Sequence, residues 1–271
     1  MEALRALETV PSADGTAIAV ERTGSGPPLV LVYGNGDVYT FWELAGVRPA
    51  FAAHCTVYAI ERRGRGESGD GDAYALEREA EDVAAVDDAI DTPVALLGHS
   101  GGALYALEAA LQTENLHQLI LYEPPMSVGD HELNVDEGVA EMNRLLGDGG
   151  SEQTLVLFLR DIAGLTTDEL DELRSAPLWQ DMVDAAPALP RELRAIAGYE
   201  FKAARFADMT TPTLLLSGSE SPPFYKDATE AVDSALPNSQ VATFEGQEHV
   251  AMLTATNRFV DEVLAFIRES N

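Results

Sequence analysis

Apolar residues gather in short runs along the first half of the chain, and segments with helical spacing separate these runs. Runs that are apolar throughout are typical of strands that helices cover on both faces of a sheet. Alternating residues near the N-terminus predict a hairpin. We expect strands at 7–10, 16–22 (TAIAVER), 29–33 (LVLVY), 56–60 (TVYAI), 94–97 (VALL) and 117–122 (HQLILY), with helices over 41–53, 74–90 and 103–111. This alternation of strand and helix predicts an α/β fold with a mostly parallel sheet.

The strand pattern stops after residue 125 and returns at residue 213. Between 126 and 209 we expect about four or five short helices, separated by glycines and prolines. The sheet then resumes with strands at 213–217 (TLLLS) and 240–244 (QVATF), with a helix at 222–236 between them and another to about residue 268. We therefore predict an α/β core made of residues 1–125 and 210–271, with residues 126–209 inserted as a helical cap.

Acidic residues outnumber basic ones by 46 to 17, which gives a formal net charge of −29. Such a surface repels phosphate groups, so nucleic acid and anionic membranes are not expected as partners. Charge repulsion of this size destabilises a compact chain unless salt screens it, so the composition favours a halophilic source over an ordinary acidic protein. The pattern of the first residues predicts no secretory signal, no stretch is expected to cross a bilayer, and Cys55 is the only cysteine. We therefore expect a cytoplasmic protein without an internal disulfide.

Ser100 lies in the turn 98–102 (GHSGG), directly between an apolar strand and an Ala- and Leu-rich helix. A sharp turn there forces the serine into a strained backbone conformation, and the glycines let neighbouring backbone approach. Such a turn lifts the hydroxyl above the sheet edge and directs the N–H groups of the helix start towards whatever the serine attacks. We interpret it as a nucleophile elbow; the alternative is an ordinary tight turn between strand and helix.

A serine nucleophile needs a base for its proton and N–H donors for the oxyanion. His249 follows the last strand in a glycine-containing loop, at the edge where open α/β sheets place their sites, so it is the expected base. His99 adjoins the serine, and its ring cannot easily turn back onto the hydroxyl. The expected donors are the backbone N–H groups of Gly101 and of Asn35, which lies between two glycines after the strand 29–33. The alternatives are an exposed loop histidine and an ordinary glycine turn.

These motifs resemble those of the α/β-hydrolase superfamily with a helical cap, over nearly the whole chain. The resemblance is carried by YGNG at 33–36, ERRGRGES at 61–68, GHSGG at 98–102 and GQEH at 246–249. It implies an eight-stranded sheet, Ser100 as nucleophile, His249 as base, and Asn35 and Gly101 as oxyanion-hole amides. Tyr33 departs from the family, which commonly has histidine there; this change concerns the shape of the pocket more than the mechanism.

The third member of the triad has two candidates. Many members of the superfamily carry an aspartate after the strand that here is 213–217, but this chain has none there before Asp227. Glu220 lies in that loop. Glu123 ends the preceding strand before two prolines, and a carboxylate at the end of an apolar strand needs a partner such as an imidazolium. We favour Glu123 as the acid, with Glu220 as the alternative; a salt bridge to an arginine such as Arg63 would give Glu123 a structural role instead.

The expected activity is that of a serine hydrolase acting on a small to medium, largely uncharged carboxylic ester or related acyl substrate through an acyl-enzyme on Ser100. No metal and no organic cofactor is expected, because the triad and water suffice for this chemistry. Carbon–carbon bond hydrolysis and cofactor-free perhydrolysis use the same residues and stay open as alternatives. A non-catalytic small-molecule-binding protein is an alternative from another class, against which Ser100 and His249 argue.

Overall fold

A computed structural model describes residues 6–44, 46–71, 73–129 and 133–269 of the chain. In this part of the chain, eight strands form one sheet in the order β1-β2-β4-β3-β5-β6-β7-β8. The first two pairings in this order are antiparallel and all the others are parallel, which confirms the mostly parallel α/β sheet. The strands are β1 (Ala6–Pro11), β2 (Ala17–Gly24), β3 (Pro28–Val32), β4 (Thr56–Ile60), β5 (Val94–His99), β6 (Leu116–Tyr122), β7 (Thr213–Gly218) and β8 (Ser239–Phe244).

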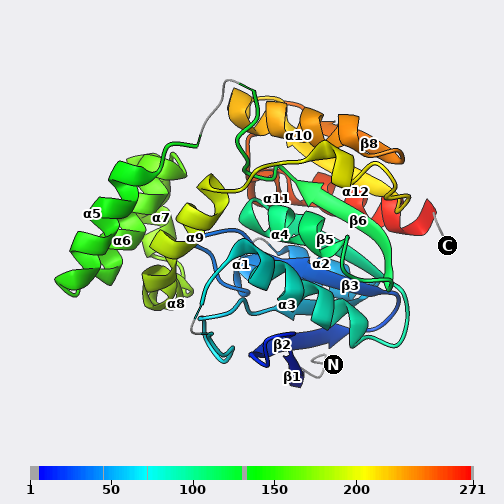
Figure 1. The fold of residues 1–271 in the computed structure, drawn as a ribbon, viewed down its shortest axis with the longest axis horizontal. Helices are drawn as coiled ribbons and strands as arrows, with labels where there is room; N and C mark the ends of the chain where they lie inside the picture. Colours follow the sequence, from blue (N-terminus) through cyan, green and yellow to red (C-terminus); the bar gives the residue numbers. More distant parts are fainter. Residues whose placement is uncertain (1–5, 45, 72, 130–132, 270–271) are drawn as a thin grey trace.

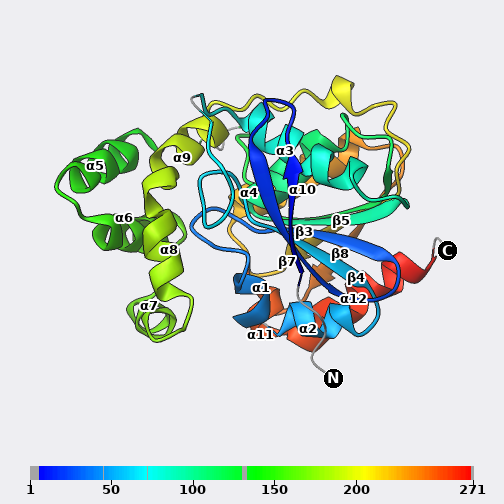
Figure 2. The same cartoon turned by 90° about the horizontal axis from the view of Figure 1, so that it is seen from below.

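Helices cover both faces of this sheet. One face packs against α3 (Leu76–Asp88), α4 (Gly101–Ala109) and α10 (Pro223–Ala235). The other packs against α1 (Phe41–Leu44), α2 (Val47–Ala52), α11 (Ala251–Thr254) and α12 (Thr256–Glu269). Figure 2 shows the two helical layers with the strands between them. The apolar strands are explained by this arrangement, because alternate side chains enter alternate layers: Val30 of β3 packs with the first layer and Leu31 with the second.

The segment expected as one helix over 41–53 is two short helices. Gly46 adopts a left-handed conformation with a φ of 69° directly before α2, and residue 45 lies outside the described residues. A helix cannot continue through this conformation, so the chain changes direction between α1 and α2. Phe41 and Trp42 of the first helix and Phe51 of the second are all buried against the sheet.

A second group of helices lies between β6 and β7 in the sequence and to one side of the sheet (Figure 1). Their shared feature is an apolar cluster of their own, which includes Met142, Leu155, Phe158, Met182 and Leu189. The helices are α5 (Asp136–Gly147), α6 (Ser151–Leu157) with a π-helical turn η1 (Phe158–Ile162), α7 (Thr167–Arg174), α8 (Trp179–Ala185) with a 3-10 turn η2 (Ala186–Ala188), and α9 (Leu189–Ala197). The chain then returns to the core, where a 3-10 turn η3 (Ala203–Arg205) contacts α10. The boundaries 126–209 for a cap stay a prediction. None of the helices among the described residues is both long and apolar enough to cross a bilayer.

Asp87 is a buried acid at the C-terminal end of α3. Its side chain is fully buried, and neither carboxyl oxygen has a hydrogen-bond partner among the described residues. Burial, with a contribution from the neighbouring Asp88, raises the pKa of Asp87 well above its usual value. The folded chain therefore holds a proton there that the unfolded chain releases above about pH 4.

Replacing Asp87 by asparagine should stabilise the protein at neutral pH. A raised pKa in the folded state means that stability is lost as the pH rises from the unfolded pKa towards the folded one. Asparagine does not titrate, so we expect the free energy of unfolding at pH 7 to rise by about 2 kcal/mol, with little change at pH 4. Urea unfolding at both pH values measures this, with the exposed Asp91→Asn as control. An equal effect of Asp87→Asn at both pH values would contradict the assignment.

Candidate active site

Ser100 lies in a strained turn between β5 and α4. Its φ is 53° and its ψ is −126°, a backbone conformation that residues other than glycine rarely adopt. The turn is tight because a Cβ on Gly98 would collide with the Gly102 carbonyl, and one on Gly102 with the carbonyl of Val32. The Ser100 N–H donates to the Tyr122 carbonyl at 2.9 Å, which ties the turn to β6. The sequence motif and the backbone strain therefore coincide at this serine.

Glu123 and His249 are hydrogen-bonded although they lie far apart in the sequence. The Nδ1 atom of His249 is 2.7 Å from Glu123 Oε2. The other carboxylate oxygen, Oε1, accepts from the Gly218 N–H at 2.8 Å and from the Ser217 hydroxyl at 3.1 Å. Glu123 also has a positive φ of 48°, directly before Pro124. The residue directly after β6 is thus a carboxylate whose oxygens reach both β7 and the histidine loop after β8.

The environment of Glu123 favours its ionised form. Complete burial of the side chain would raise the pKa, but the hydrogen bonds and charge interaction with His249 and the Gly218 N–H outweigh burial and lower the pKa. Since a carboxylate only accepts hydrogen bonds, His249 must donate from Nδ1. The tautomer of neutral His249 is thereby fixed, with Nε2 unprotonated and available as a base.

Glu220 and Arg63, the alternative acid and the alternative partner, lie elsewhere. Glu220 is exposed; its carboxylate accepts from the Ser219 hydroxyl at 3.2 Å, and its backbone N–H donates to the Gln247 carbonyl at 2.9 Å. Arg63 pairs with Asp82 and Asp14 and not with Glu123. Of the two acids that the sequence offered, the structure brings Glu123 to His249.

Three aromatic residues hold the loop that carries His249. The Tyr122 hydroxyl donates to the Glu248 carbonyl at 2.5 Å and accepts from the Ala251 N–H at 3.1 Å. His99 Nε2 donates to the His249 carbonyl at 2.9 Å, and burial lowers the pKa of His99 well below its usual value, so this ring stays neutral. Tyr225 of α10 stacks on the His249 ring, with 4.0 Å between ring centroids. Sequence reasoning missed these roles, because buried aromatic residues on strands, such as His99 and Tyr122, are typical of packing, and no local pattern shows that Tyr225 of α10 lies against the histidine loop.

The Ser100 hydroxyl and His249 Nε2, the two groups expected to react, are not hydrogen-bonded to each other in this structure. His249 Nε2 is buried and without a hydrogen-bond partner among the described residues. The His99 ring, directly before Ser100 in the sequence, lies 4.7 Å from the His249 ring, measured between centroids. In enzymes, a hydrogen bond between a nucleophile and its base often forms only when substrate is present, so this geometry agrees with the predicted roles.

Asn35 and Gly101 meet beside the serine turn. A Cβ on Gly101 would collide with Asn35 Oδ1, so only glycine fits there. A Cβ on Gly34 would come within 2.9 Å of Ser100 Cβ, which brings the start of this loop to the serine. Neither the Asn35 nor the Gly101 backbone N–H has an acceptor within the part of the chain that the structure describes. Two free donors therefore lie close to Ser100.

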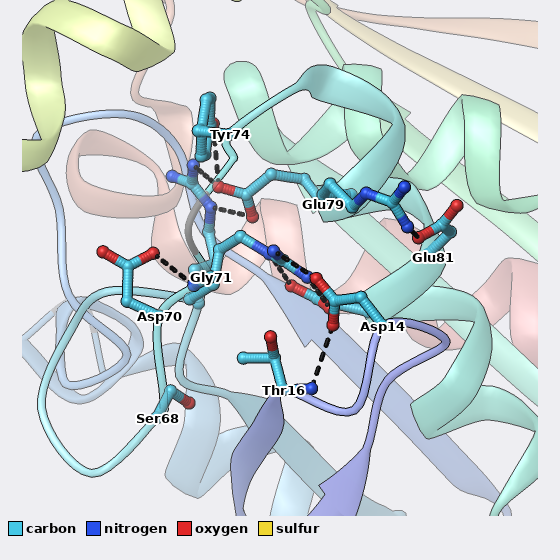
Figure 3. Close-up of polar contacts among 12 residues, drawn as sticks. Asp14, Thr16, Ser68, Asp70, Gly71, Tyr74, Glu79 and Glu81 are labelled. Carbon is cyan, nitrogen blue, oxygen red and sulfur yellow. Dashed lines mark hydrogen bonds and ion pairs between the residues drawn. The ribbon is translucent and has the colours of Figure 1, made fainter.

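The arginines of the loop 61–66 form several buried ion pairs. Arg62 donates to Glu79 of α3 at 2.6 Å and 3.0 Å, and the Tyr74 hydroxyl donates to the same carboxylate at 2.9 Å (Figure 3). Arg65 pairs with Glu192 of α9 at 2.5 Å. Sequence reasoning also missed Glu192, although a loop rich in arginines and an acid on the apolar face of a helix were signals for it.

No group of three or more potential ligands, taken from His, Cys, Asp and Glu, could hold a metal ion among the described residues.

Known proteins share this fold along nearly the full chain. An alpha/beta hydrolase from Sphaerobacter thermophilus is 35% identical, with a TM-score of 0.78, over 94% of this chain and 99% of its own. An esterase from Rhodococcus sp. ECU1013 shares the fold at 23% identity, with a TM-score of 0.74, over 98% of this chain and 99% of its own. A pimeloyl-[acyl-carrier protein] methyl ester esterase from Aeromonas hydrophila is 28% identical over 260 residues, covering 93% of this chain and 99% of the esterase.

A model of the alpha/beta hydrolase family matches residues 29–262, a span that includes the serine turn, the two candidate acids Glu123 and Glu220, and His249. The match extends over most of the chain, and the resemblance drawn from the sequence motifs is confirmed. The chain therefore belongs to the alpha/beta hydrolase family.

Proposed function

We propose that this protein is a serine hydrolase that cleaves a small to medium, largely uncharged carboxylic ester through an acyl-enzyme on Ser100. The observation that carries the proposal is the 2.7 Å hydrogen bond from His249 Nδ1 to the buried Glu123 carboxylate, in a site that also holds the strained Ser100 turn. A base in a fixed tautomer within reach of a serine is the arrangement that activates a hydroxyl, and the His249 ring lies 4.7 Å from the ring of His99, the residue before Ser100.

In the acylation step, Ser100 Oγ attacks the ester carbonyl carbon while its proton passes to His249 Nε2. Glu123 stabilises the imidazolium that forms, because its carboxylate is ionised and already bonded to Nδ1. The N–H groups of Asn35 and Gly101 donate to the oxyanion. When the tetrahedral intermediate collapses, the carbon–oxygen bond to the alcohol breaks and the alcohol leaves with the proton from His249.

Deacylation repeats the sequence with water. His249 Nε2 takes a proton from a water molecule, whose oxygen attacks the acyl carbon of the acyl-enzyme. The same two N–H groups donate to the second oxyanion. The bond to Ser100 Oγ then breaks, the carboxylic acid is released, and the proton returns from His249 to the serine. No step needs a metal or an organic cofactor.

Two further observations support the proposal, the first for an ester and the second for a substrate without charge. The relative from Aeromonas hydrophila is named as a methyl ester esterase, and its match covers nearly the whole chain. The formal net charge of −29 opposes the approach of anionic substrates, and salt weakens this effect. A neutral ester meets no such barrier.

Covalent labelling tests the proposal directly. Wild-type protein in high salt should hydrolyse a series of p-nitrophenyl esters of short to medium acyl length. An organophosphonate probe should abolish this turnover at one label per chain, with the adduct mapped to the peptide that contains Ser100. Heat-denatured protein serves as control. Folded protein that neither turns over esters nor takes the label, or takes it elsewhere, would refute the proposal.

A further inference from the structure

The side chain of Asn35 is held by a residue from the group of helices beside the sheet. Its Nδ2 donates to Glu192 Oε2 at 2.6 Å and to the Tyr105 hydroxyl at 3.2 Å. Glu192 belongs to α9, whereas Tyr105 belongs to α4 below the serine turn. Both amide hydrogens of Asn35 are thus used, and the side chain cannot rotate without losing a bond to a buried acceptor.

Glu192 is fully buried and carries a negative charge. Its Oε1 lies 2.5 Å from Arg65 Nη1 and 3.4 Å from Arg62 Nη2, and its Oε2 accepts from Arg65 Nη2 at 2.9 Å. Burial alone would raise the pKa of Glu192, but the two arginines outweigh it and lower the pKa to about 2. The group is therefore a carboxylate at neutral pH, held in one orientation by two buried guanidinium groups.

This carboxylate determines how the Asn35 amide faces. A carboxylate accepts hydrogen bonds only, so it must meet the NH₂ end of the amide, and the carbonyl oxygen must point the other way. That oxygen, Oδ1, packs against Gly101, where a Cβ would collide with it. The contact joins the two residues whose backbone N–H groups we assign to the oxyanion. Arg62 Nη1 also donates to the Gly34 carbonyl at 3.1 Å, so the same ion cluster holds the loop one residue earlier.

The residues that follow Asn35 also contact the helices beside the sheet. A Cβ on Gly36 would collide with the Phe158 ring of η1, so loop and ring are in close contact. Val38 is buried in the apolar cluster of these helices rather than in either layer of the sheet. The loop 34–38 is therefore attached to this group of helices by one polar contact and two apolar ones.

We propose that Glu192 is a positioning residue, which holds Asn35, one of the two donors of the oxyanion hole. The position of this donor then depends on how α9 packs on the core. The inference rests on the proposed function, since the hole matters only if Ser100 attacks a carbonyl. Glu192 touches neither Ser100 nor the reacting atoms in this scheme; it acts through the Asn35 side chain. A loss of this contact leaves the donor present but displaced, and a displacement of about 1 Å is enough to slow a reaction strongly.

Glu192→Gln tests the inference, with Asp82→Asn as the matched control. Asp82 is also buried in a two-bond pair with an arginine of the same loop, Arg63, at 2.7 Å for both bonds. We expect Glu192→Gln to lower kcat by roughly 10- to 100-fold with KM changed by less than about threefold. The Ki of a trifluoromethyl ketone with the matching acyl chain should rise by the same factor as kcat/KM falls, because its adduct resembles the transition state. Asp82→Asn should leave kcat within about threefold of wild type.

A double-mutant cycle with Asn35→Ala separates positioning from stability. Asn35→Ala leaves the ion pairs of Glu192 in place, so it should reproduce the kcat loss even if Glu192→Gln does not fold. In the Asn35→Ala background, Glu192→Gln should lower kcat little further, since the contact between the two side chains is already gone. Additive effects, a wild-type kcat for folded Asn35→Ala, or equal losses in Glu192→Gln and Asp82→Asn would overturn the inference. If wild-type protein takes no phosphonate label, the proposed function fails; if it does and these variants are unaffected, only the positioning role fails.

Discussion

Replacing Ser100 by alanine should lower kcat/KM for a p-nitrophenyl ester by about 10⁵-fold, because the attacking oxygen is removed. The loss should lie in kcat and not in KM, since the pocket and both N–H donors stay in place. Initial rates with the best ester of the series measure the loss, and the phosphonate probe should no longer label the chain. The alanine must still adopt the strained turn, with a φ near 53°. Thermal unfolding of the variant therefore controls for a local change of fold.

Residual activity decides between Ser100 and any other nucleophile. Turnover above about 1% of wild type, after trace wild-type enzyme has been excluded by titration with the probe, would show that another group attacks the ester. The background should instead resemble catalysis by the oxyanion donors and substrate binding alone.

Glu123→Gln should lower kcat by about 10³- to 10⁴-fold, whereas Glu220→Gln should have little effect. In the first variant, the Gly218 N–H and the Ser217 hydroxyl will still require an acceptor. The new amide is therefore expected to turn its carbonyl oxygen towards them and its NH₂ group towards His249 Nδ1. His249 would then accept at Nδ1 and carry its proton on Nε2. In this tautomer it cannot take the proton of Ser100.

Glu220→Gln is the matched control because it makes the same chemical change in the neighbouring loop. The Glu220 side chain is exposed, and its backbone bond to Gln247 does not depend on the carboxylate. The two variants are compared by kcat across the pH range, with circular dichroism to confirm folding. A larger loss in Glu220→Gln than in Glu123→Gln would show that Glu220 is the acid.

The fold could be predicted from the sequence because local patterns of apolar and polar residues indicate its strands and helices. The run 29–33 is apolar at every position since both faces of β3 are covered, and the pattern requires no knowledge of the partner helices. The turn at Ser100 was predictable for a similar reason, as only small residues fit so close to Val32 and Gly102. The break between α1 and α2 was missed because a single glycine inside helical spacing does not reveal its φ.

The site was only partly predictable, because its contacts join residues that are remote in sequence. Glu123 and His249 are 126 positions apart, and they meet because β6, β7 and β8 are neighbours in the sheet, an order that no local pattern contains. The prolines after Glu123 favoured it as the acid but did not show that it lies beside His249. Asn35 and Glu192 are 157 positions apart, and their contact depends on where α9 docks. Arginine-rich loops signal that buried acids are needed without saying which acids these are.

The ion cluster at Glu192 limits how the helices beside the sheet could be exchanged between relatives. A chimera that replaced α9 with a helix lacking an acid at this position would leave Arg62 and Arg65 buried without their shared partner, which costs about 3–5 kcal/mol for a broken buried pair. Exchange of α5 to α8 alone leaves the cluster intact. The segment best suited to recombination therefore ends before Leu189, and α9 is inherited with the core.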